Sequence, residues 1–220
     1  MLARWIFALG LLGLAFAANA TLLLREPSKP QAPSGTAEID LSGLPLKVSR
    51  ALILDPAQRG GGRLLRLDLA LDRRTFEPLP PPSLTQDGAS TPQKLHLVLT
   101  NPGLQAPPAD QLQQLYARFL LAETQNTPTG LMLRRFRPGT PYEDRELFIG
   151  AGQFGGGLGR LFIALCPKSG ILDIEPCTAK LRHEGVDIEL RFPAQALSDW
   201  RRIATEAFRI VGEMRSSEPG

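Results

Sequence analysis

Side chains that alternate between apolar and polar run through much of the chain after about position 37, which is the period of a half-buried β-strand. The clearest case is Val186–Phe192, with apolar residues on one face and charged residues on the other. Residues 65–71 and 95–99 alternate in the same way. Weaker strand patterns cover 37–41, 45–54, 130–137, 145–149 and 161–166, and 179–182 is placed to form a hairpin with Val186–Phe192.

Two segments carry apolar residues at helical spacing instead. The first starts at Pro107-Pro108 and places Leu112, Leu115, Tyr116, Phe119 and Leu120 on one stripe. The second runs from Ala194 to Met214 behind Pro193. Because strands and helices do not alternate regularly, a doubly wound nucleotide-binding fold is disfavoured. We expect an α+β fold, with an antiparallel or mixed sheet and both amphipathic helices packed on one face of it.

The N-terminus carries an export signal. Residues 5–24 contain no charged side chain, and at ~1.5 Å rise per residue they could span a ~30 Å hydrocarbon core. Ala18-Asn19-Ala20 also has the small-x-small pattern that signal peptidase accepts. Both interpretations stay open: a single-pass inner-membrane anchor with the C-terminal domain in the periplasm, or a secreted or periplasmic protein released by cleavage near Ala20.

The chain divides into four parts on this basis. Residues 1–24 are a signal anchor or signal peptide, and 25–36 form a tether rich in Pro and Ser. Residues 37–215 are expected to form a single periplasmic α+β domain, and 216–220 a frayed tail.

Composition narrows the chemistry. Of 220 residues, 43% are hydrophobic and 21% charged, which is typical of a globular domain. The net charge is only +3 and no dense basic stripe is present, so nucleic acid is not an expected partner. The chain has only two cysteines and two histidines, and we predict no metal or cofactor. Cys166 and Cys177 enclose ten residues; a bond between them would stabilise an exported protein by about 3 kcal/mol, the alternative being two unpaired thiols.

One stretch is locally basic. Between positions 47 and 74, seven cations stand against three aspartates, which suggests a binding site for anionic lipid or polysaccharide. The alternative is a charged outer strand face that only keeps the domain soluble. The seven candidate residues are Lys47, Arg50, Arg59, Arg63, Arg66, Arg73 and Arg74.

Candidate catalytic groups are few. Glu143, Asp144 and Glu146 could supply paired carboxylates for a hydrolase acting on an envelope polymer, although an acidic turn before a strand explains them equally. The segment 150–155 matches G-x-G-x-x-G, but a strand pattern follows it where a dinucleotide site needs a helix, so a glycine-rich hairpin is expected. His96 and His183 lack any catalytic motif and are interpreted as surface residues.

The order of several segments forms a further pattern. It comprises an N-terminal anchor, 43–48, 63–71, a helix with a tyrosine, 130–135, 141–147, the two cysteines and RFPAQALSDWRRI at 191–203. In this order the chain resembles a family of bacterial envelope proteins with one membrane anchor and a small α+β domain. The resemblance implies topology and compartment, and it brings no activity and no cofactor.

Together these observations predict a membrane-tethered periplasmic domain that binds a protein partner and is not an enzyme. A more specific form of the hypothesis is an immunity or accessory protein for an envelope-acting partner. The envelope-polymer hydrolase and the anion-binding module remain as alternatives.

Overall fold

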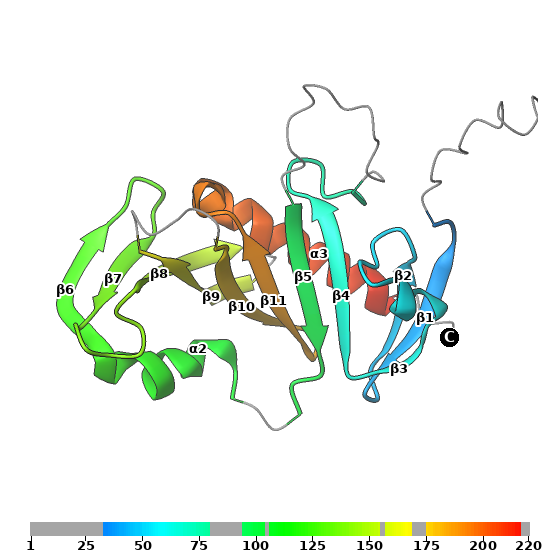
Figure 1. Cartoon of the computed structure of the whole chain (residues 1–220), viewed down its shortest axis with the longest axis horizontal. Coiled ribbons are helices and arrows are strands. Elements are labelled where there is room, and N and C mark those ends of the chain that lie inside the picture. Colours follow the sequence, from blue (N-terminus) through cyan, green and yellow to red (C-terminus); the bar gives the residue numbers. More distant parts are fainter. Residues whose placement is uncertain (1–32, 80–93, 104–105, 155–156, 169–174, 217–220) are drawn as a thin grey trace, which may run out of the picture. The chain divides into compact units, whose positions relative to one another are not determined.

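The computed structural model describes residues 33–79, 94–103, 106–154, 157–168 and 175–216 (Figure 1). The predicted membrane or signal helix over 1–24 lies outside these ranges, as do most of the tether and of the tail. No helix within the described ranges combines the length and apolar composition that a membrane crossing requires.

An eight-stranded sheet forms most of the described structure. Its strands are β4 (Arg66–Asp72), β5 (Lys94–Thr100), β6 (Leu120–Asn126), β7 (Met132–Phe136), β8 (Arg145–Phe154), β9 (Gly157–Pro167), β10 (Cys177–His183) and β11 (Val186–Phe192). They lie in the order β4-β5-β11-β10-β9-β8-β7-β6, and every neighbouring pair is antiparallel. The predicted α+β class with a large antiparallel sheet is therefore confirmed.

A second sheet of three strands lies earlier in the chain. It consists of β1 (Thr36–Leu41), β2 (Pro45–Ser49) and β3 (Gly62–Leu64) in the order β2-β1-β3, with β1 and β3 parallel. The predicted strand over 45–54 ends at Ser49, where the Leu52 amide donates to the Ser49 carbonyl and turns the chain. Residues Pro56–Gly60 then form the short 3-10 helix η1.

The second predicted helix is confirmed. After Pro193 the 3-10 helix η4 (Ala194–Asp199) leads into α3 (Trp200–Ser216), which packs against β8, β10 and β2 and lies behind the large sheet in Figure 1. Its apolar stripe is buried in a core that also takes side chains from both sheets. The stripe comprises Trp200, Ile203, Ala204, Ala207, Phe208, Val211 and Met214. We call the face of the large sheet that packs against α3 the covered face.

The prediction that both helices cover one face is wrong. The first helical segment consists of α2 (Pro108–Gln111), the π-helical turn η2 (Leu112–Tyr116) and the 3-10 turn η3 (Ala117–Phe119). It packs on the opposite face, over Leu147, Ile149 and Ile163, in a separate apolar cluster. The physical reason lies in β9, where successive residues are apolar, so that Phe162 and Ala164 face α3 while Ile163 faces the first helix. The predicted helix also stops before Leu120, which begins β6.

A buried disulfide and a glycine allow close packing on the covered face. Cys166 and Cys177 are bonded, as predicted, and join β9 to β10 inside the core. Gly150 lies in β8 directly against the indole of Trp200, and a Cβ there would come within 2.8 Å of ring carbons of that side chain. Residues 150–154 of the glycine-rich segment thus belong to β8, which pairs antiparallel with β9 as expected for a hairpin, and Gly150 allows Trp200 to approach the sheet.

Candidate functional site

The most elaborate polar surface of the described structure lies on β4, β5, β11 and β10. Side chains alternate across a strand, so the residues between the buried leucines of these strands point away from α3. The pairing registers align them in rows, for example Arg66, Thr100, Asp187 and Arg182 across the four strands. We call this surface the polar face. It comprises Arg66, Asp68, His96, Val98, Thr100, Asp187, Glu189, Arg191, Thr178, Lys180 and Arg182.

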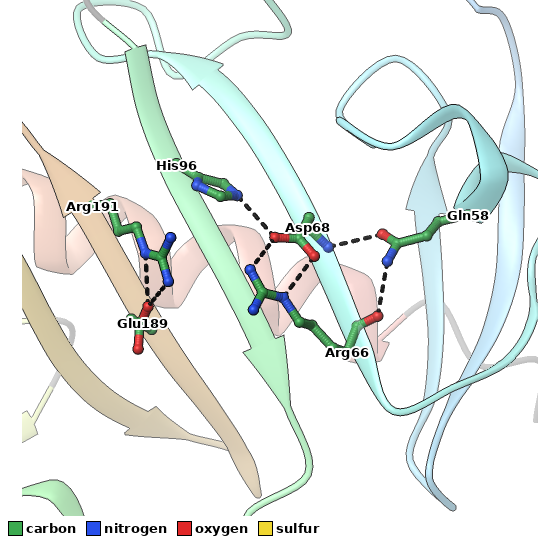
Figure 2. A network of polar contacts seen from close by, with 6 residues as sticks. All are labelled: Gln58, Arg66, Asp68, His96, Glu189 and Arg191. Carbon is green, nitrogen blue, oxygen red and sulfur yellow. Dashed lines mark hydrogen bonds and ion pairs between the residues drawn. The ribbon is translucent and has the colours of Figure 1, made fainter.

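Asp68 is the centre of one network on the polar face (Figure 2). Arg66 Nε and Nη2 donate to its two carboxylate oxygens at 2.8 and 2.6 Å, and His96 Nε2 lies 3.0 Å from Oδ1. Gln58, from η1, donates to the Arg66 carbonyl at 3.1 Å and accepts from the Asp68 amide at 3.0 Å. The carboxamide thereby satisfies two backbone groups on the outer edge of β4.

The network shifts two protonation equilibria. The hydrogen bond from Arg66 lowers the pKa of Asp68, so the carboxylate stays ionised. Burial lowers the pKa of His96, because the charged imidazolium loses water, and the hydrogen bond with Asp68 opposes that effect in part. The side chains of Asp68 and His96 are each only 16% exposed, so neighbouring atoms restrict their movement on the sheet.

Two further ion pairs lie beside this network. Arg191 holds Glu189 with Nε at 2.8 Å and Nη2 at 2.6 Å. Arg182 holds Asp187 in a two-point contact, with Nε at 2.5 Å and Nη2 at 3.0 Å. Arg182 binds both oxygens of Asp187, whereas both nitrogens of Arg191 contact the single oxygen Oε1 of Glu189. Two-point contacts restrict the orientation of the partners, so the polar face presents charges in set positions.

A cavity of about 450 Å³ opens where the polar face meets the first helical segment. Tyr116 and Tyr142 lie on one side of it, with their rings edge to face and their ring centroids 5.2 Å apart. The pKa of Tyr116 is raised mainly by burial and to a smaller extent by the neighbouring Tyr142. The sheet contributes apolar, hydroxyl and charged groups to the other walls. The complete lining is Pro108, Gln111, Tyr116, Pro141, Tyr142, Asp144, Arg145, Ile163, Leu165, Thr178 and Lys180.

A smaller cavity of about 180 Å³ continues from the first toward β4. The two share Pro108, Gln111 and Lys180, so together they form one groove across the sheet. Within the ranges that the structure describes, no group of histidine, cysteine and acidic residues is arranged to hold a metal ion.

The seven predicted anion-binding residues do not converge on one surface. Lys47 and Arg63 lie on the small sheet in register with Glu38 and Asp40, and Arg63 is 3.8 Å from Asp40. Arg66 is the only one of the seven on the polar face as defined above.

The remaining four cations make contacts within the fold. Arg50 and Arg59 donate to the carbonyls of Arg59 and Ile53, and Arg73 reaches Asp199 at 2.5 Å. Arg74 follows two residues after the end of β4, and it is its backbone carbonyl, not its guanidinium, that accepts a hydrogen bond from Arg202. Anion binding by this set stays a prediction.

The three candidate carboxylates are also separated. Glu143 accepts a hydrogen bond from the Gly139 amide at an exposed turn, and Asp144 lines the larger cavity. Glu146 is buried on the covered side, where Arg135 Nε donates to it at 3.1 Å. The structure therefore does not assemble the acid and base pair that the hydrolase alternative requires.

Sequence reasoning did not identify Asp68, Glu189, Arg191 or Tyr142 as site residues. For Asp68, Glu189 and Arg191 the signal was present as polar positions of alternating strands, whereas Tyr142 lies in the turn before β8. Only the strand order places β11 between β5 and β10, so that these positions become one surface. His96 was correctly placed opposite the leucines, but its contact with Asp68 was not foreseen. His183 stacks on Phe208 of α3 at 4.7 Å.

These features define an α+β domain whose antiparallel sheet has one face covered by α3. The opposite face is covered by the first helical segment over β8 and β9 and is charged and grooved over β4, β5, β11 and β10. No protein-family model matches the sequence, and no curated protein is significantly similar to it. Smlt3025, an immunity protein of the Stenotrophomonas maltophilia type IV secretion system, is similar in structure with a TM-score of 0.56, covering 84% of this chain and 94% of that chain at 10% identity. The comparison with the iron-regulated outer membrane lipoprotein FrpD of Neisseria meningitidis gives a TM-score of 0.48, covering 87% of this chain and 97% of that chain at 9% identity. The likeness to Smlt3025 shows a common fold.

Proposed function

We propose that this chain is a non-enzymatic interaction domain of the bacterial cell envelope that binds a protein partner through the polar face. The observation that carries the proposal is the combination of fixed ion pairs and a continuous groove on the side of the sheet opposite α3. Charges held in set positions give an interface its specificity and its association rate, because only a complementary partner satisfies them all.

The compartment is part of the proposal. Residues 1–24 would tether the domain to the inner membrane, with the domain in the periplasm, or would be removed there as a signal peptide. The buried disulfide between Cys166 and Cys177 supports an oxidising compartment, since such bonds are rare in the reducing cytosol. The resemblance to anchored envelope proteins supports the same topology.

The finer proposal is that the partner acts on the envelope and that this chain is its immunity or accessory protein. Smlt3025 shares the fold and is an immunity protein, so the fold is compatible with that role. An immunity protein needs a preorganised binding surface and no catalytic group. The separation of Glu143, Asp144 and Glu146 favours this function over the hydrolase alternative.

The test exchanges charges without removing an ion pair. In E189R/R191E the two residues can still pair with each other, while the charge pattern on the polar face is inverted. Because residue 189 lies opposite Lys180, thermal unfolding verifies that the variant is folded. The control is E206R/R209E on α3, where Arg209 Nε lies 2.7 Å from Glu206. This exchange keeps that pair but removes the contact of Arg209 with Glu213 at 2.6 Å, so thermal unfolding verifies the fold of the control. Each tagged full-length chain is purified from detergent-solubilised envelopes of its host, and co-purified proteins are quantified by mass spectrometry.

We expect one stoichiometric partner with the wild-type chain and with the α3 control, and at least about a tenfold loss with E189R/R191E, because charge reversal at an interface costs several kcal/mol. Recovery of no partner in repeated experiments contradicts the function. Equal recovery with both exchanges contradicts the assignment of the polar face.

A further inference from the structure

The groove on the polar face extends across the strands of the large sheet. Its lining residues come from β4, β5, β11, β10, β9 and β8, six strands that are successive neighbours in the sheet. Five intervals of about 4.8 Å give a length of about 24 Å, which is the span of about seven extended residues at ~3.4 Å each. These dimensions suit a stretch of polypeptide, because a compact small molecule would fill only one of the two cavities.

All but one of the cationic side chains that line the groove form ion pairs with carboxylates of the same chain. Arg66 pairs with Asp68, Arg191 with Glu189, and Arg145 reaches Glu175 at 2.5 Å. Lys180 lies at the junction of the two cavities with its side chain exposed. Glu189 stands opposite it in the register of β10 and β11 but is held by Arg191, so within the described ranges Lys180 is the one cationic lining residue that forms no ion pair. An ammonium group in this position is complementary to a carboxylate of an incoming segment.

The larger cavity adds a second requirement. Its walls combine the rings of Tyr116 and Tyr142 with Pro108, Pro141 and the apolar side chain of Leu165, an environment that takes up an apolar side chain. The aromatic wall is firmly supported, since Phe136 lies 5.1 Å from Tyr142 and 6.0 Å from Tyr116. The turn that carries Tyr116 is π-helical, a conformation often found at functional sites.

We propose that the groove binds an extended protein segment of about seven residues, in which a carboxylate pairs with Lys180 and a neighbouring apolar side chain enters the tyrosine-lined cavity. This inference rests on the proposed function and names the chemistry that the partner presents to the polar face. The segment would cross the strands at a steep angle, along the line of the two cavities, and would leave the existing ion pairs intact.

The test uses a displayed library of random twelve-residue peptides, selected on the full-length chain in detergent. Selections run in parallel on the wild-type chain, on K180M, which removes the charge but keeps the aliphatic stem, and on K47M as control. Lys47 is also an exposed lysine on a strand, but it lies on the small sheet away from the groove. Both changes are at exposed sites, and thermal unfolding of each variant verifies the fold.

We expect the wild-type and K47M chains to enrich peptides that share an acidic residue next to an aromatic or aliphatic one, and K180M to lose this enrichment. In the best peptide, replacing Asp by Asn should weaken binding to the wild-type chain about fivefold, and it should have no effect on K180M. Absence of enriched peptides, enrichment without a common acidic residue, or acidic enrichment that survives in K180M overturns the inference. A peptide result of this kind leaves the charge-exchange experiment unaffected, so failure of the groove and failure of the proposed function are distinguishable.

Discussion

On β4, β5 and β11, each strand contributes alternate residues to two surfaces of different character. Leu67, Leu97 and Leu190 point to the covered face and are fully buried with the apolar stripe of α3. Asp68, His96 and Glu189 point to the polar face, where each is held by a charged or hydrogen-bonding neighbour. We therefore expect the covered face to supply most of the stability of the domain, and under the proposed function the polar face serves recognition.

The covered face and the polar face are expected to contribute different amounts to the free energy of unfolding, because their side chains make different kinds of interaction. Burying apolar area excludes water and stabilises roughly in proportion to that area. Ion pairs at the surface contribute little, because water screens them and their side chains lose freedom. Substitutions on the two faces should therefore separate loss of folding from loss of binding.

The largest effect is expected at Trp200. Its indole packs 5.1 Å from the ring of Phe162, donates to the Thr129 carbonyl at 3.1 Å and is only 1% exposed. W200A should lower the free energy of unfolding by about 3–5 kcal/mol, because it leaves a cavity and removes the hydrogen bond of the indole. Urea unfolding followed by far-UV circular dichroism measures the change.

Leu65 is the matched control, since its side chain is 82% exposed. L65A should change the free energy of unfolding by less than about 0.5 kcal/mol. A loss below about 1 kcal/mol for W200A would show that the covered face is not the main source of stability.

Removal of the disulfide is expected to have the second largest effect on the free energy of unfolding. C166A/C177A removes a link that closes a loop of ten intervening residues in the core, and we expect a loss of about 3 kcal/mol relative to the oxidised wild type. Reductant should destabilise the wild-type chain and leave the double variant unchanged. A double variant as stable as the oxidised wild type would mean that packing alone holds β9 to β10.

A smaller effect on stability is expected from the polar face. E189A/R191A removes one ion pair whose side chains are 27% and 39% exposed, so the free energy of unfolding should fall by about 1 kcal/mol or less at neutral pH. The same double variant should nevertheless reduce recovery of the partner. A loss of 3 kcal/mol or more in urea unfolding would abolish the distinction between a stabilising face and a recognition face.

The smallest effect concerns pH. Because the pKa of His96 is lowered in the folded chain, the unfolded chain binds this proton more readily. The contribution of His96 to stability is therefore complete above the ordinary histidine pKa of 6.5 and is lost as the pH falls below it. Asp68, whose pKa is also lowered, contributes stability above its ordinary value of 3.8 and loses it only at more acidic pH.

H96Q tests the histidine effect separately. Between pH 8 and pH 5.5 the stability of H96Q should decline less than that of the wild-type chain, as measured by urea midpoints at several pH values. His183 is present in both proteins, so the difference reports on His96. Equal slopes in the two proteins would show that the polar face does not shelter this side chain from water.

The sequence predicted local structure well and spatial relationships less well. Alternation identified β4, β5 and β11 because the pattern lies within each strand. β6 was missed, since Leu120–Asn126 is rich in residues that favour helices and its polar side chains are exposed at the sheet edge. The apolar run over 161–166 predicted a strand but did not indicate that both of its faces are buried, which led to the wrong side for the first helix.

By itself, the sequence determined the class of the fold, most of its strands, the second helix and the chance of a disulfide, because these depend on residues close together in the chain. Only the tertiary structure decided that β11 lies between β5 and β10, which aligns Asp68, His96, Glu189 and Lys180 on one surface. The physical reason is that a polar position in an isolated strand is compatible with any neighbour. The order and register of the strands, set by the burial of their apolar faces against α3, select which polar side chains meet.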